Sequence, residues 1–175
     1  KGGQWERALE LLDQLRSRGL EPGVIAYSAA ISACELAGEH GHAERLLVAA
    51  ISSALRPSLR ESGVLDLHDL SAPVARTAVR LALGDMVRRP DDRRFHDVEN
   101  GGDFAMYTGR GGHTDRCGAI LAMFRDEFAG RVECREDDWN PGHLVVPAAS
   151  LRGWLRRHSS GEEPSAEQPE GSPPL

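Results

Sequence analysis

The chain has 175 residues, of which 40% are hydrophobic, and its net charge is −6. This length allows one ordinary domain or two small ones. No apolar run approaches the roughly 18 residues that a membrane-spanning helix requires. The first residues show no signal-peptide or transit-peptide pattern. We therefore expect a packed core and no membrane-spanning segment in this sequence.

Charge is unevenly distributed along the chain. Residues 159–175 hold four Glu and no basic residue, so most of the net charge lies in an acidic tail that is expected to be disordered. The remainder is nearly neutral, which excludes bulk basic attraction to nucleic acid and leaves local patches for any such binding. The three Cys residues are far apart and form no Cys-x-x-Cys pair, so neither a disulfide scaffold nor a structural zinc site is expected.

The first third of the chain repeats itself with a period of 35 residues. The same residue recurs at six pairs of positions: Gly3 and Gly38, Ala8 and Ala43, Leu11 and Leu46, Leu12 and Leu47, Leu20 and Leu55, Pro22 and Pro57. Apolar residues at helical spacing predict helices over 4–18, 24–37 and about 42–55, separated by Gly and Pro. The repeating unit is therefore predicted to be a pair of antiparallel helices.

The segments GQWERALELLDQLRSRGLEPG and VIAYSAAISACELAGEHGHAERLL resemble the pentatricopeptide repeat. The resemblance implies an α-solenoid fragment over residues 1–58, with a partial repeat at 1–23, a full repeat at 24–58 and further repeats upstream. It also implies binding of single-stranded RNA, with about one base read through Ser28 and Ser58. A surface or capping role for these serines stays open. The tetratricopeptide repeat has a similar period of about 34 residues, but its aromatic pattern is missing.

From residue 60 onward the pattern changes to alternating strands and helices. Short apolar or alternating runs predict strands at 63–68, 104–107, 131–135 and 143–146. Helices are expected at about 71–89, 114–129 and 148–157, with Ser71 able to cap the first of them. The order β-α-β-α-β-β predicts an α/β sandwich over residues 62–157, which makes the whole chain α+β.

Two motifs fall at the ends of the first two predicted strands. Asp66-x-His68 ends the first strand, and the glycine-rich turn 108–113 ends the second. A β-α-β crossover makes such strands parallel, and ligands bind at the carboxyl ends of parallel strands. The turn offers free backbone N–H groups at a helix N-terminus, to which Arg110 and His113 add donors suited to phosphate. An isolated Asp-x-His is usually structural, but its pairing with an anion-binding turn favours a functional site.

The segments LDLHDLS, YTGRGGHT and NPGHLVV, in this order, resemble the signature motifs of the Smr (small MutS-related) domain. Asp69 stands where that family usually has Gly. The resemblance implies a nuclease role for Asp66 and His68. It implies substrate binding by the turn residues Thr108, Gly109, Arg110, Gly111 and Gly112. Proteins that join pentatricopeptide repeats to an Smr domain are known in organelles, so the resemblance implies a chloroplast or a mitochondrion as the compartment.

We therefore expect an RNA-binding endoribonuclease of organelle RNA processing or gene expression. In the route we favour, His68 removes the ribose 2′-hydroxyl proton, Asp66 holds its tautomer, and His113 protonates the leaving oxygen. A route through a divalent metal such as Mg²⁺ at Asp66 stays open, although no metal site is otherwise predicted. A non-cutting RNA-binding or scaffold protein and a DNA-nicking endonuclease are the alternatives.

Overall fold

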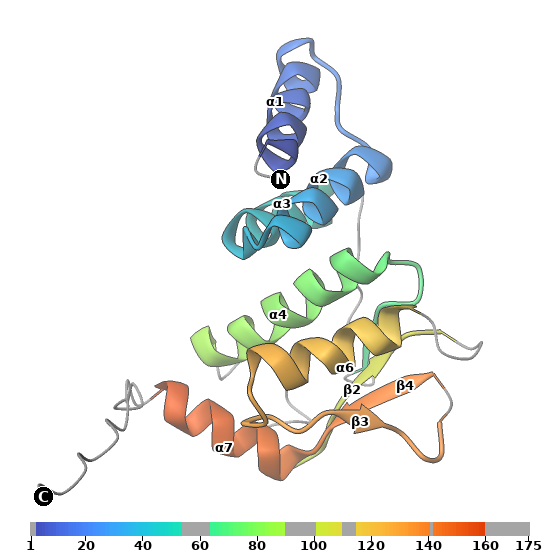
Figure 1. Ribbon diagram of the computed structural model, residues 1–175, viewed down its shortest axis with the longest axis vertical. Helices are drawn as coiled ribbons and strands as arrows, with labels where there is room; N and C mark the ends of the chain where they lie inside the picture. Colours follow the sequence, from blue (N-terminus) through green and yellow to red (C-terminus); the bar gives the residue numbers. More distant parts are fainter. Residues whose placement is uncertain (1–2, 54–63, 90–100, 110–114, 141, 160–175) are drawn as a thin grey trace, which may run out of the picture.

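The computed structural model describes residues 3–53, 64–89, 101–109, 115–140 and 142–159. Within these ranges, six helices and four strands form a mixed α/β structure. The elements are stacked along the long axis of the molecule (Figure 1). Helix α1 lies at one end, followed by α2 with α3, then by α4 with α6, and finally by the sheet and α7.

Three helices, which we call the helical segment, form the N-terminal layers. They are α1 (Gln4–Ser17), α2 (Val24–Ala37) and α3 (His40–Ser53). The first two end in the same way, at a glycine with positive φ, which is 71° at Gly19 and 83° at Gly38. Glycine tolerates this left-handed conformation, which closes the last turn of a helix. The three predicted helices are confirmed, although α3 begins two residues earlier than expected.

Equivalent positions of the 35-residue repeat differ in burial. Leu46 in α3 is 9% exposed, whereas Leu11, its equivalent in α1, is 47% exposed. The reason is that α3 packs against both α2 and α4, while α1 packs mainly against α2. Sequence similarity within the repeat therefore does not translate into equal contributions to the core.

The sheet has the strand order β1-β2-β4-β3. Its strands are β1 (Val64–Asp66), β2 (Phe104–Tyr107), β3 (Arg135–Glu136) and β4 (His143–Val146). β1 and β2 are parallel neighbours, whereas β4 is antiparallel to both β2 and β3. The expected parallel arrangement of the first two strands is confirmed. Their carboxyl ends therefore meet at one edge of the sheet.

The core of the α/β part lies between the sheet and two helices, α4 (Ala72–Arg88) and α6 (Asp115–Glu127). Leu65, Met106 and Leu144 occupy neighbouring positions on β1, β2 and β4 and are at most 3% exposed. Helix α7 (Ala148–Ser159) follows β4, and its Trp154 ring packs against Phe128. On its other side α4 contacts α2 and α3, so it is a layer shared by the two parts of the chain.

The strand predicted over residues 131–135 is wrong for most of its length. Only Arg135 belongs to β3, which continues to Glu136. Residues 129 and 130 have positive φ, and the amide of Glu133 donates to the Ser150 hydroxyl at 2.7 Å instead of to a neighbouring strand. The apolar alternation that suggested a strand comes from Val132, which is buried at 2% exposure, and Cys134, which packs partly buried against the core.

Other boundaries differ in smaller ways. Of the predicted strand 63–68, the described residues 64–68 form a strand over Val64–Asp66, and residues 67 and 68 lie beyond its end. Ser71 precedes α4 as expected but makes no capping hydrogen bond through its side chain. The predicted loop 90–102 falls mostly outside the described residues, as does the acidic tail. Among the described helices, none is long and apolar enough to cross a membrane.

Candidate functional site

Asp66 and His68 form a close pair at the carboxyl end of β1. Asp66 Oδ1 lies 2.6 Å from His68 Nδ1 and also accepts a hydrogen bond from the His68 amide at 3.2 Å. The Asp66 side chain is only 9% exposed, whereas that of His68 is 42% exposed. The carboxylate thus holds the imidazole from the protein side through Nδ1 and leaves the ring open to solvent. This is the arrangement that fixes the tautomer of a histidine that exchanges protons.

A second carboxylate lies on the other nitrogen of the ring. Asp69 Oδ2 is 3.1 Å from His68 Nε2, and the Asp69 side chain is 86% exposed. The ring can donate to both carboxylates only when both nitrogens carry hydrogen. In this conformation Asp69 therefore occupies Nε2, and a substrate can reach that nitrogen only after the Asp69 side chain turns away into solvent.

The glycine-rich turn begins directly beside His68. Gly109 has φ of 101°, and a Cβ atom built on it would lie 3.5 Å from the Cβ of His68. The close approach predicted for the two motifs is therefore present as far as Gly109. Arg110, Gly111, Gly112 and His113 lie outside the described residues.

Arg116 ties the two loops together. Its Nε donates to the carbonyl of Thr108 at 3.1 Å, and its Nη1 donates to the carbonyl of Leu70 at 3.1 Å. Arg116 is not among the site residues predicted from the sequence. One signal was present, because a cation in the first turn of a helix opposes the helix dipole and needs a compensating partner.

Thr108 connects the turn to β4. Both its amide and its hydroxyl donate to the carbonyl of Gly142, at 2.8 and 3.0 Å. Thr108 is one of the turn residues predicted to bind phosphate, but the residue is 1% exposed and its hydroxyl is engaged within the protein. Thr108 therefore holds the strand ends together at this edge.

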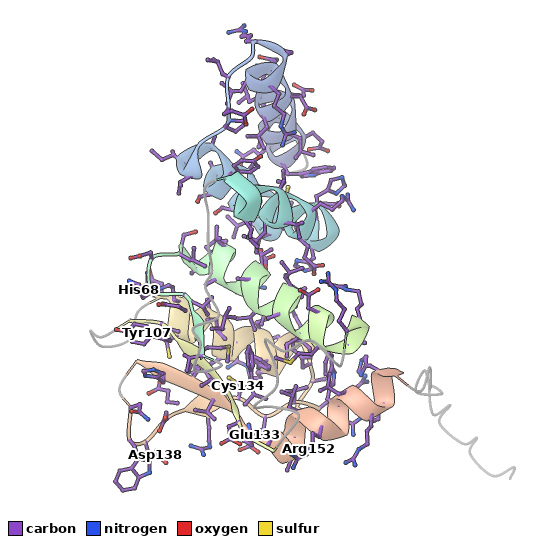
Figure 2. The ribbon with its side chains drawn as sticks, turned by 180° about the vertical axis from the view of Figure 1, so that it is seen from behind. His68, Tyr107, Glu133, Cys134, Asp138 and Arg152 are labelled. Carbon is purple, nitrogen blue, oxygen red and sulfur yellow. The ribbon has the colours of Figure 1, made fainter. Side chains whose placement is uncertain are left out.

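An aromatic row extends from His68 across the sheet. The Tyr107 ring centroid lies 5.6 Å from that of His68 and 4.9 Å from that of His143. Tyr107 is opposite Asp66 on β1 and His143 on β4, so the register places all three on one face of the sheet. Figure 2 shows His68 and Tyr107 together at this edge.

His143 Nδ1 is buried and has no hydrogen-bond partner among the described residues. Neither Tyr107 nor His143 was predicted as a site residue, although strand register could have indicated both.

The turn between β3 and β4 reaches the same edge. Asp137 accepts hydrogen bonds from the Asn140 side chain at 2.8 Å and from the Trp139 amide at 2.9 Å. These hydrogen bonds lower the pKa of Asp137, and the bond from the Asn140 side chain has the largest effect. The ordered turn leaves Trp139 88% exposed. This edge of the sheet therefore combines aromatic surface with several carboxylates.

The remaining predicted site residues are separate from this cluster. Ser28 lies on α2 in the helical segment and is partly exposed, while Ser58 lies outside the described residues. Within the described ranges, no three His, Cys, Asp or Glu side chains are grouped so as to hold a metal ion.

Comparison with models of known protein families finds no match. Comparisons with curated proteins and with solved structures find none either.

Proposed function

We propose that this protein is an endoribonuclease that binds single-stranded RNA through its helical segment and cuts it at the Asp66–His68 pair. The observation that carries the proposal is the 2.6 Å contact between Asp66 and His68 Nδ1, beside the start of a glycine-rich turn. The resemblance of the two parts to pentatricopeptide repeats and to an Smr domain supports the same function. It also supports the proposal that the protein acts in an organelle.

The proposed reaction is an internal transesterification. His68 Nε2 takes the proton of the ribose 2′-hydroxyl, and the 2′-oxygen attacks the neighbouring phosphorus. The bond from phosphorus to the 5′-oxygen breaks, and that oxygen takes a proton from His113 or from water. The products are a 2′,3′-cyclic phosphate and a 5′-hydroxyl end. Asp66 stabilises the imidazolium that forms at His68, which is how a carboxylate assists a histidine base.

One observation favours the non-cutting alternative. The Asp69 carboxylate occupies the nitrogen that has to accept the proton, and its negative charge opposes an approaching phosphate. Because Asp69 is 86% exposed, rotating its side chain away from the ring costs little packing. We therefore retain the nuclease proposal and treat an RNA-binding protein without cleavage activity as the second candidate.

The test uses the purified chain and two labelled oligonucleotides, an RNA and the same strand with a single 2′-deoxy position. Cleavage of the RNA with 2′,3′-cyclic phosphate ends, and protection at the 2′-deoxy position, are expected. The His68→Ala variant should lose at least about a hundredfold in cleavage rate while RNA binding changes little. His158→Ala, which removes an exposed histidine at the end of α7, is the matched control. Full cleavage by His68→Ala would refute the proposed mechanism, and cleavage at the 2′-deoxy position would indicate a DNA-type nuclease.

A further inference from the structure

The two loops of the candidate site lead directly into the two helices that cover the sheet. Helix α4 begins at Ala72, three residues after Asp69, and α6 begins at Asp115, shortly after Gly109. A rotation or shift of either helix would therefore move one of the loops. The relative placement of α4 and α6 sets the geometry between His68 and the glycine-rich turn.

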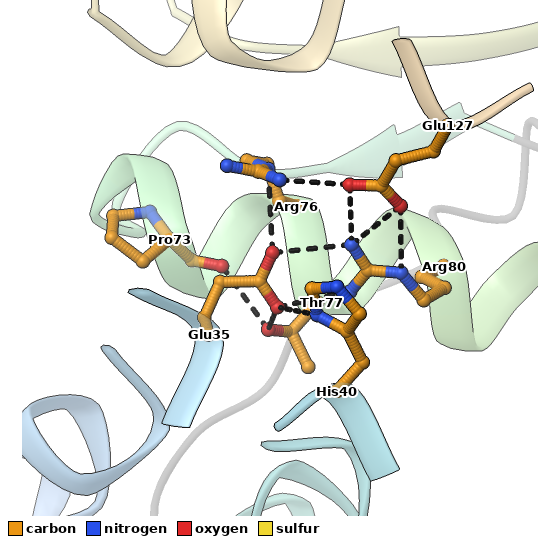
Figure 3. A network of polar contacts seen from close by, with 7 residues as sticks. All are labelled: Glu35, His40, Pro73, Arg76, Thr77, Arg80 and Glu127. Carbon is orange, nitrogen blue, oxygen red and sulfur yellow. Dashed lines mark hydrogen bonds and ion pairs between the residues drawn. The ribbon is translucent and has the colours of Figure 1, made fainter. Parts of the chain in front are cut away.

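Away from the site, the same two helices are joined by a network of charges that also includes the helical segment (Figure 3). This junction network consists of Glu35 and His40 from the helical segment, Arg76, Thr77 and Arg80 from α4, and Glu127 from α6. Arg80 donates to both oxygens of Glu35, at 2.9 and 3.1 Å, and to both oxygens of Glu127. One guanidinium thus connects α2, α4 and α6.

Further contacts complete the surroundings of the Glu35 carboxylate. The Thr77 hydroxyl donates to it at 3.0 Å. His40 Nδ1 and Arg76 Nε each lie 3.3 Å from one of its oxygens. The Arg76 contact is an ion pair without hydrogen-bond alignment, and its Nε finds no hydrogen-bond partner in the described part of the chain. Arg76 also binds Glu127 at 2.8 Å.

The burial of Glu35 makes this network sensitive to orientation. Its side chain is 0% exposed, so water cannot replace a lost partner. Hydrogen bonds to a buried carboxylate weaken steeply with misalignment, and an unpaired buried charge is strongly unfavourable. A shift of α2 on α4 would therefore separate the buried Glu35 carboxylate from Arg80.

We propose that Glu35 is a positioning residue, which through Arg80 fixes the helical segment relative to the two helices that carry the candidate site. The inference rests on the proposed function. Ser28 lies on the same helix as Glu35. A fixed orientation of α2 therefore keeps the distance constant between the nucleotide bound at Ser28 and the phosphate bound at His68. Cleavage then falls at a constant number of nucleotides from the base that the helical segment holds.

The decisive variant is the double substitution Glu35→Leu/Arg80→Leu. It removes one negative and one positive charge together. Arg76 and Glu127 remain as an ion pair in which each charge neutralises the other. Replacing a buried ion pair by apolar residues often leaves stability unchanged, so this variant is expected to fold. The matched control is Arg7→Leu/Glu10→Leu, which removes an exposed ion pair of 2.7 Å from the same helical segment.

The first measurement maps cut positions along an end-labelled single-stranded RNA. The wild-type chain and the control should cut at one or two adjacent positions. Glu35→Leu/Arg80→Leu should cut at a broader set of positions, with kcat at the summed positions within about threefold of wild type. An equally narrow pattern in the double variant would overturn the proposal, because packing alone would then fix the orientation. A broad pattern in the wild type would overturn it as well.

The second measurement does not depend on nuclease activity. Spin labels on Ile25→Cys in α2, where the native side chain is 87% exposed, and on Asp126→Cys in α6 report the distance between the two parts. A single narrow distance distribution is expected for wild type and control, and a broadened one for the double variant. Equal distributions would refute the positioning role. If the wild-type chain cuts no RNA but these distributions differ as expected, the nuclease proposal fails while the positioning of the helical segment stands.

Discussion

Replacing Arg80 by Met tests how much the junction network contributes to stability. Arg80 is 15% exposed and binds Glu35 and Glu127, so its removal leaves a fully buried carboxylate with only part of its partners. Breaking one side of a buried ion pair costs about 3–5 kcal/mol. Arg76 stays close to both carboxylates, so we expect the lower end, about 3 kcal/mol. For a chain of this size, that corresponds to a decrease in melting temperature of roughly 6–12 °C.

The effect should depend on pH in a defined direction. Burial alone would raise the pKa of Glu35, but the hydrogen bonds and charge of Arg80 outweigh it and hold that pKa below its usual value. A lowered folded-state pKa adds stability above the unfolded value of about 4.3, and this stability is lost as pH falls through the folded-state pKa. In Arg80→Met the pKa of Glu35 should rise instead. The difference in stability between wild type and variant should therefore be largest near neutral pH and already smaller at about pH 4, because Glu35 of the variant takes up its proton at a higher pH than in the unfolded chain.

Urea denaturation followed by circular dichroism, at neutral pH and at about pH 4, measures both quantities. Arg125→Met serves as the control, since Arg125 pairs with Asp126 at a side-chain exposure of 75% and should show no measurable change. A loss below about 1 kcal/mol at neutral pH would refute the argument from burial. A loss that is the same at both pH values would refute the assignment of the effect to Glu35.

Three further predictions follow from the site and the thiols. Asp69→Asn removes the carboxylate next to His68 Nε2. It should raise kcat/KM on single-stranded RNA by roughly fivefold, because the repulsion between an exposed carboxylate and a phosphate is about 1 kcal/mol. A decrease in kcat/KM would contradict the inhibitory role of Asp69. Gly109→Ala should destabilise the chain by about 1–2 kcal/mol in urea because φ at this position is 101°. Gly118→Ala in α6, where an added Cβ meets nothing within 4 Å, should stabilise it instead, and equal effects would refute the reasoning. Burial raises the pKa of Cys117 to about 11 and that of Cys134 to about 12, and Cys34 is fully buried, so a thiol reagent at about pH 8 should label these residues only after unfolding.

Local patterns predicted the elements whose burial follows a simple period. The boundaries of β2, β4 and α2 agree with the sequence analysis because each is set by an unbroken apolar pattern or by glycine. The strand expected at 131–135 failed because the buried Val132 and the partly buried Cys134 can both be accommodated in irregular backbone. The rule for parallel strands correctly placed His68 beside Gly109, with Asp66 opposite Tyr107.

The residues missed from the sequence depend on partners in other elements. Arg116 acts on the carbonyls of Thr108 and Leu70, which belong to two separate loops. Glu35 is the only charged residue of α2, and nothing near it in the sequence indicates that its partners are on α4. Such contacts require the packing of the helices to be known, whereas the Asp66-x-His68 pair is contained in three consecutive residues.

The burial of α4 on two sides has a consequence for dividing this chain into exchangeable modules. The covalent boundary suggested by sequence lies near residue 60, but α4 contacts α2 and α3 on one side and α6 on the other. Excision of the α/β part at that point would uncover an apolar helix surface and leave Arg76 and Arg80 with Glu127 alone. Uncovered apolar area of this kind promotes aggregation. A grafting experiment that joins this α/β part to another array of helices should therefore carry α2 and α3 along with it, so that the junction of the chimera falls before Val24.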